Sequence, residues 1–136
     1  MVVVSLDSSV VIDLANGRSE RLRDRYVTAR AAGEAFVVSS LVYHEVAYGA
    51  VLGGRYDLEM RLISAIIGGL PIEPFNRDDA LEAGRLRAEL RRGGTPIPVL
   101  DTLIAGQARF RGWSIATANL RDFTRMPGLD VQAWVP

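Results

Sequence analysis

Three carboxylates of this chain stand in apolar surroundings at widely separated points. Asp7 closes the first apolar run, Glu45 lies within an otherwise apolar stretch, and Asp101 follows Val99-Leu100 as a second strand-to-acid signature. Carboxylates that converge repel one another, and their pKa values rise unless a cation neutralises the charge. Oxygen-only ligands favour Mg²⁺ or Mn²⁺ over zinc. If the three side chains converge, a divalent cation is therefore the natural occupant.

Each acid also has a structural interpretation that the sequence leaves open. Asp7 and Asp101 both stand where a helix is expected to begin, so either could be a helix cap. Glu45 could be a partly buried ion-pair partner, although at helical spacing it shares its face with mainly apolar residues. His44 points about 100° away from Glu45 on the same helix, and we interpret it as a structural or surface histidine.

Alternating strand and helix patterns must position these acids. Apolar and β-branched runs predict strands at 2–6, 35–38, 71–75, 113–116 and 131–135, the third at an edge because of its prolines. Amphipathic patterns predict helices at 9–14, 19–32, 40–52, 57–67, 76–92, 101–111 and 121–125. Asp57 is expected to cap the fourth helix, and Asn76 with Asp79 the fifth. We therefore expect one α/β domain over residues 1–136, a three-layer α/β/α sandwich with a mainly parallel central sheet.

The composition excludes several kinds of chemistry. The chain has 136 residues, zero formal net charge and no cysteine, so thiolate metal sites and cysteine nucleophiles are excluded. All 16 basic residues are arginine, which excludes P-loop and Schiff-base mechanisms that need lysine. No run is long enough to span a bilayer, and no basic region precedes the first apolar run. We expect a cytoplasmic protein with no membrane partner.

Arginines gather between Arg18 and Arg30, where only Glu20 and Asp24 oppose them. Zero net charge argues against a globally basic nucleic-acid binder. A local run of this kind is either a solvated helix face or a patch that contacts phosphate.

Four motifs in order along the chain resemble those of PIN-domain ribonucleases, and most closely the VapC-type toxins of bacterial toxin–antitoxin modules. The resemblance covers essentially the whole length. It rests on the segments 6–12, 39–49, 96–105 and 116–123, followed by Pro127-Gly128-Leu129 and Trp134. The resemblance implies a PIN-like fold.

The resemblance also implies a set of site residues. Asp7, Glu45 and Asp101 match the metal-binding and catalytic acids of the family. The fourth family position, often aspartate, falls on Asn119, which brings no charge; Asp122, one helical turn away, is expected to supply some charge through a water.

Hydroxyl groups complete the set that the resemblance implies. Ser8 and Thr117 match hydroxyl positions that line the site, with caps of adjacent turns as the alternative. Ser9 stands where the family commonly has asparagine, a departure whose effect the sequence does not give.

The implied activity is cleavage of RNA phosphodiester bonds by one or two Mg²⁺ ions, for which Mn²⁺ is expected to substitute, with a 5′-phosphate and a 3′-hydroxyl as products. Arg18, Arg21 and Arg25 are the candidates for RNA contact. The resemblance implies a cognate antitoxin that neutralises the toxin, and a homodimer. The alternative is a catalytically silent PIN-like interaction module, because Asn119 dilutes the charge. A haloacid-dehalogenase-like phosphatase would need a second acid at Ser9 and a later lysine, and the chain has neither.

Overall fold

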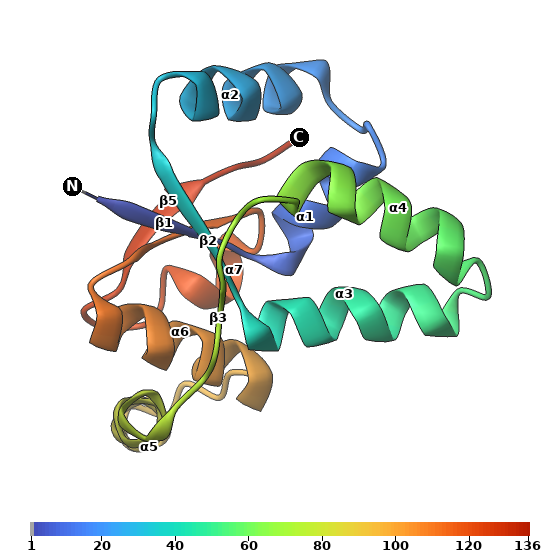
Figure 1. Cartoon of the computed structure of the whole chain (residues 1–136). Coiled ribbons are helices and arrows are strands. Elements are labelled where there is room, and N and C mark those ends of the chain that lie inside the picture. The colour runs from blue at the N-terminus through green and yellow to red at the C-terminus, as the bar shows by residue number, and fades with distance from the viewer. Residues whose placement is uncertain (1) are drawn as a thin grey trace.

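The computed structural model describes residues 2–136, which form five strands and seven helices (Figure 1). The strands are β1 (Val3–Leu6), β2 (Ala35–Ser39), β3 (Ile72–Glu73), β4 (Ser114–Thr117) and β5 (Asp130–Ala133). The helices are α1 (Ser8–Ala15), α2 (Glu20–Ala31), α3 (Ser40–Leu52), α4 (Tyr56–Ile67), α5 (Arg77–Arg92), α6 (Val99–Arg111) and α7 (Leu120–Phe123).

The strands form one sheet in the order β3-β2-β1-β4-β5, and every pairing is parallel. β1 is central and all its neighbours are parallel to it. The carboxyl ends of β1, β2 and β4 therefore lie side by side at one end of the sheet. In Figure 1, α2 lies on one side of the strands, and α5 and α6 lie on the other. The expected three-layer α/β/α sandwich is therefore confirmed, as is the edge position of the proline-flanked β3.

The central strands are buried on both faces, as a parallel sheet between helices requires. Leu6, Val38 and Ile115 have no exposed surface and belong to one hydrophobic cluster that joins the two helical layers. Each such side chain stabilises the fold by about 1.5–3 kcal/mol. This packing holds the ends of β1, β2 and β4 rigidly, and with them the residues that follow.

α5 and α6 pack unusually closely through one glycine. A Cβ atom on Gly106 would lie 2.4 Å from the Cα atom of Ala83, closer than real side chains approach a backbone. α6 ends at Gly112, whose φ of 71° is the left-handed conformation that favours glycine at a helix C-terminus. α6 is therefore held at a fixed position relative to α5.

Two expected helix starts are wrong. Val99 and Leu100 form the first turn of α6 rather than a strand, and Pro98 occupies the capping position, because proline's fixed φ suits a helix start. Asp101 is therefore not a cap. Asp57 lies in the first turn of α4 and likewise does not cap it; there its charge favours the helix dipole.

The expected capping box of α5 is confirmed, since Asn76 accepts from the backbone of Asp79 and Asp79 accepts from the backbone of Asn76. Across residues 2–136 we find no helix with the length and apolar character needed to cross a membrane.

Candidate active site

Asp7 occupies the turn between β1 and α1 and is almost fully buried, with 4% of its surface exposed. Its backbone N–H donates to Ala116 of β4 at 2.9 Å. Its carboxylate makes no capping hydrogen bond to α1. Instead, Oδ2 accepts from the hydroxyls of Thr117 at 2.8 Å and Ser9 at 3.0 Å. Asp7 therefore holds the N-cap position of α1, but its side chain binds these hydroxyls and does not cap the helix.

Those two hydroxyls are themselves held in place by backbone groups of the β4–α7 turn. The N–H of Ala118 donates to Ser9 Oγ at 3.2 Å, and the N–H of Asn119 donates to Thr117 Oγ1 at 2.9 Å. Because each hydroxyl oxygen already accepts a hydrogen bond, its own proton is free to point at the carboxylate of Asp7. Thr117 thus both orders the turn and lines the site.

Glu45 reaches the same region from the second turn of α3. Its Oε1 atom is buried and has no hydrogen-bond partner among residues 2–136. Burial raises the pKa of Glu45 to about 7, and the negative charges of Asp7 and Asp101 add to the rise, while the hydroxyl of Ser8, at the start of α1, opposes it. An acceptor left unpaired in this way costs about 1–3 kcal/mol, which indicates a group kept for another purpose.

Asp101 lies in the first turn of α6 and faces the start of α7. The side-chain amide of Asn119 donates to Asp101 Oδ2 at 3.4 Å and to Asp122 Oδ2 at 3.2 Å. Burial raises the pKa of Asp101 to about 6, together with the charges of Asp7 and Asp122. Asn119 therefore bridges two carboxylates that would otherwise repel each other.

The carboxylates share one electrostatic environment, since the charges of Asp7 and Asp101 raise the pKa of Glu45, and those of Asp7 and Asp122 raise the pKa of Asp101. Burial also raises the pKa of Asp7, although the hydroxyls of Thr117 and Ser9 act in the opposite direction. None of the ion pairs within residues 2–136 involves any of these acids. The structure thus brings the predicted acids together and gives them no cationic side chain.

The donor set suits a hard divalent cation, because it consists of carboxylate, amide and hydroxyl oxygens. No three acidic or imidazole groups within residues 2–136 already stand in the arrangement of a finished metal site. The unpartnered oxygen of Glu45 and the raised pKa values are nevertheless what a cation would satisfy. Metal binding at this site stays a prediction.

Other predicted residues lie elsewhere. Arg21 donates to the carbonyl of Val135 at 2.9 Å, and Arg25 donates to the carbonyl of Ala133 at 2.7 Å. Arg25 also lies over the ring of Trp134, 4.1 Å from its centre. Arg18 pairs with Asp13 at 3.7 Å. Within residues 2–136, no hydrogen bond or ion pair links these arginines to Asp7, Glu45, Asp101 or Asp122, and their contact with RNA stays a prediction.

His44 is exposed and stacks on Tyr48, as expected for a surface histidine. Sequence reasoning left Ser9 without a role, although it holds Asp7. Its position two residues after Asp7 is a usable signal, because the start of α1 turns its hydroxyl back toward that carboxylate.

Comparison with known proteins identifies the family to which the chain belongs. The family model described as PIN domain matches residues 4–129. A relative from Salmonella typhimurium, tRNA(fMet)-specific endonuclease VapC, is 32% identical over 98% of this chain and 99% of its own length. Ribonuclease VapC2 from Haemophilus influenzae is 30% identical over 99% of this chain and all of its own.

Solved structures agree with these relatives. The DNA-bound VapBC of Salmonella typhimurium contains a chain that is 30% identical to this one, with a TM-score of 0.88 over 98% of this chain and 99% of that one. VapBC-1 from nontypeable Haemophilus influenzae has a chain 26% identical, with a TM-score of 0.82 over 97% and 98%. The chain therefore belongs to the PIN domain family, within its VapC branch.

Proposed function

We propose that this protein is a divalent-cation-dependent endoribonuclease that acts as the toxin of a toxin–antitoxin pair. The observation that carries the proposal is the convergence of Asp7, Glu45 and Asp101 at one sheet edge, where their pKa values are raised and no arginine pairs with them. Perturbed acids in such a place are typical of active sites. The ribonuclease names of the relatives support the same activity.

In this proposal, Mg²⁺ is held by Asp7, Glu45 and Asp101, and Mn²⁺ substitutes for it. When bound, the cation would neutralise charge on a phosphodiester and make water a stronger nucleophile near neutral pH. The pKa of Glu45 is about 7 when no cation is bound, and a bound cation would hold this carboxylate in its ionised form near neutral pH. The two hydroxyls on Asp7 and the amide of Asn119 fix the direction of their carboxylates, which pre-organises the site.

The proposed protein partners are a cognate antitoxin and a second copy of this chain. The antitoxin is supported by the VapBC complexes that related chains form. A groove of about 720 Å³ between α1, α2 and α4 offers it an apolar seat.

The apolar residues of α3 and α4 are only partly used by the core. Val46 and Ile63 pack into the core, but Val51, Leu52 and Leu58 are exposed. These exposed residues support self-association.

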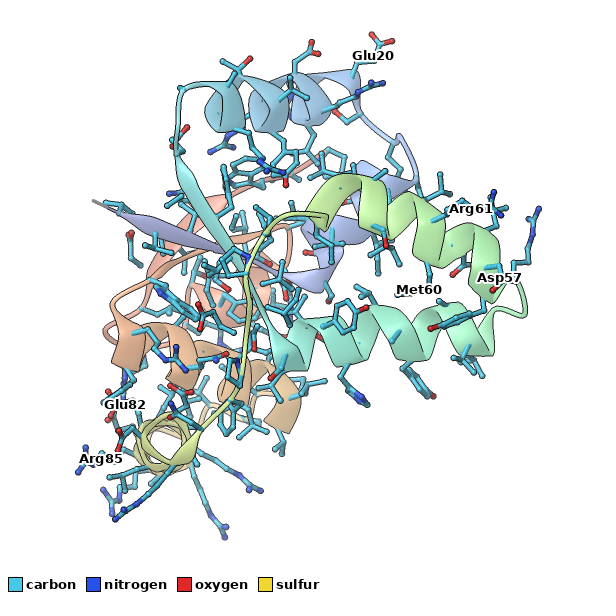
Figure 2. All side chains as sticks on the ribbon, in the orientation of Figure 1. Glu20, Asp57, Met60, Arg61, Glu82 and Arg85 are labelled. Atoms are coloured by element: carbon cyan, nitrogen blue, oxygen red, sulfur yellow. The ribbon has the colours of Figure 1, made fainter. Side chains whose placement is uncertain are left out.

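The decisive experiment replaces Asp7 with asparagine, which keeps the shape and removes the charge. Asp7→Asn should lower metal-dependent RNA cleavage by 100-fold or more and leave the fold intact. Asp57→Asn is the matched control, because Asp57 lies exposed near the outer end of α4 (Figure 2). Transfer RNA is the first substrate to test, given the name of the Salmonella relative. An Asp7→Asn variant as active as its parent would overturn the site.

The silent interaction module is tested by the cation alone. Mn²⁺ at 100 times its Kd should stabilise the parent by about 2.7 kcal/mol, measured as a shift in Tm, and Asp7→Asn should lose the shift. A parent protein that Mn²⁺ does not stabilise and that leaves RNA intact would favour the module. Expression without the antitoxin should arrest growth, and Asp7→Asn should restore it.

A further inference from the structure

A second feature lies beside the acids, on the other side of the same turn of α6. A cavity of about 320 Å³ opens between the end of α5, the α5–α6 loop and the start of α6. Its lining includes Arg87 and Arg91 from α5, Ile97 from the loop, and Val99 and Thr102 from α6. Nothing described so far uses this cavity.

The two arginines of the cavity carry free positive charge. Arg87 and Arg91 are one helical turn apart, so they share one face of α5, and both are exposed. Neither makes an ion pair within residues 2–136. Arg109 and Arg111 of the facing helix differ, since both are held by carboxylates. The charge of the cavity is therefore available to an anion from outside.

The rest of the lining is mainly apolar, with Thr95 and Thr102 as its polar side chains. Leu90, Pro96, Ile97 and Val99 border the cavity, and Val99 has 46% of its surface exposed. Two guanidinium groups facing an apolar wall suit a ligand that joins a phosphate to a flat or carbon-rich group. A nucleotide has this composition.

The cavity lies close to the acids. Asp101 stands in sequence between Val99 and Thr102, which both line the cavity, so the two sites share the first turn of α6. A helix with its side chains is about 10–12 Å across, which limits the separation. The close contact between Gly106 and Ala83 fixes α5 against α6, so the arginines keep a constant distance from Asp101.

Electrostatics favours an anionic polymer that spans both sites. The acid cluster by itself repels RNA, and Arg21 and Arg25 of α2, which were predicted to contact RNA, already donate to backbone carbonyls of the C-terminal segment. Arg87 and Arg91 supply the missing positive charge next to Asp101, where phosphate contacts position a nucleic acid.

We propose that this cavity is a subsite for one nucleotide of the RNA strand next to the bond that is cleaved. Arg87 and Arg91 bind its phosphate, and the wall formed by Pro96, Ile97 and Val99 contacts its sugar and base. The proposal rests on the proposed ribonuclease function and adds a second place where the substrate is held. It assigns the main positioning charge to α5 rather than to α2.

The test compares Arg87→Gln, Arg91→Gln and the double variant with Arg85→Gln. Arg85 is the matched control, because it lies on the same helix but pairs with Glu82 at 3.8 Å, away from the cavity (Figure 2). For cleavage of a single-stranded RNA oligonucleotide, KM should rise about 10-fold for each cavity variant and kcat should change little. Arg85→Gln should match the parent. Arg87→Lys should recover part of the loss, because it restores the charge.

Binding is measured separately from cleavage, with fluorescently labelled RNA and the Asp7→Asn background. The slope of log affinity against log salt should fall by about 0.7 for each arginine removed. Inorganic phosphate and a mononucleotide are used as competitors. The RNA subsite requires that both compete far more weakly than the oligonucleotide; equal competition would make the cavity a site for free phosphate compounds and overturn the proposal.

The outcomes separate the two proposals. A parent that does not cleave RNA overturns the ribonuclease function, and the subsite falls with it. A parent that cleaves RNA, with cavity variants whose KM and salt slope equal those of Arg85→Gln, overturns the subsite alone. Thermal melts of every variant show that a loss of binding is not a loss of fold.

Discussion

Two groups of carboxylates in this molecule are treated in opposite ways. Between α5 and α6, Asp79 has no exposed surface and accepts two hydrogen bonds from Arg111, at 3.0 and 2.8 Å. Burial alone would raise the pKa of Asp79, but these bonds lower it below its usual value. At the sheet edge, Asp7, Glu45 and Asp101 are buried or half-buried with no arginine, and their pKa values are raised.

The difference teaches how to separate structural acids from functional ones. A buried carboxylate with an arginine partner belongs to the fold, because removing one partner leaves an unpaired charge. Buried carboxylates without a partner reduce stability, and a chain retains them where the charge serves a function. The bond from Asp79 to Arg111 and the unpartnered oxygen of Glu45 mark the two cases.

The largest expected effect comes from breaking the paired group. Asp79→Asn should lower the free energy of unfolding by about 3–5 kcal/mol, because it leaves the guanidinium of Arg111 without its main partner. Asp101→Asn should leave the free energy of unfolding at pH 7 unchanged or increase it, because it relieves repulsion. Urea denaturation of both variants measures the contrast. Equal losses for the two would show that the groups do not differ.

The second prediction concerns the pH dependence of stability, measured with a chelator present so that no metal ion is bound. Since the pKa of Glu45 is raised to about 7 in the folded chain, the folded state binds more protons than the unfolded state from about pH 4.5 to 7. The contribution of Glu45 to stability is therefore greatest below this window and falls as pH rises through it, by about 2–3 kcal/mol in total. Asp79 contributes nothing to this slope above pH 5, because it is ionised in both states.

Glu45→Gln should flatten that pH dependence, measured as Tm or urea midpoint between pH 5 and 7.5. The exposed Glu20→Gln change is the control and should keep the parent's slope. A parent whose stability rises with pH over this range would contradict the raised pKa values.

The third prediction concerns the hydroxyl groups that orient Asp7. Thr117→Val keeps the shape but removes the 2.8 Å bond to Asp7 and the acceptor for the N–H of Asn119. RNA cleavage should fall about 10-fold, with a loss of stability of about 1–2 kcal/mol. Thr28→Val, an exposed change on α2, should have neither effect. Full activity in Thr117→Val would assign the hydroxyl a purely structural role.

The smallest effect is expected at the surface. The side chains of Arg85 and Glu82 approach to 3.8 Å, and the Arg85 side chain is 65% exposed. Arg85→Gln should change the free energy of unfolding by less than about 0.5 kcal/mol, measured by urea denaturation. A loss comparable to that of Asp79→Asn would mean that exposure does not separate the two kinds of ion pair.

Periodicity and residue type were enough to predict most of the fold. The apolar runs that became β1, β2 and β4, and the glycine at position 112 that ends α6, are local signals that the structure confirms. The acids were predictable because charge inside an apolar stretch is unusual. The start of α6 was not predictable, because proline occurs both in irregular loops and at helix starts. Only the packed structure decides between the two.

The contacts around the site lie beyond sequence reasoning for a different reason. Ser9 and Thr117 both bind Asp7, yet 108 residues separate them, so only the pairing of β1 with β4 shows that they meet. The arginines of α2 were a reasonable expectation from charge alone. Their bonds to Ala133 and Val135 depend on where the C-terminal segment lies, which no local pattern gives.

The position of β4 between β1 and β5 has a consequence for synthesis of the chain. Asp7 is synthesised first, and Thr117 follows 110 residues later, with Asn119 and Asp122 directly after it. Until then β1 lacks its second neighbouring strand, and the Thr117 hydroxyl that donates to Asp7 is missing. The acids are therefore not assembled. The order of strands in the sheet therefore delays assembly of the acids until β4 and the residues after it have been synthesised.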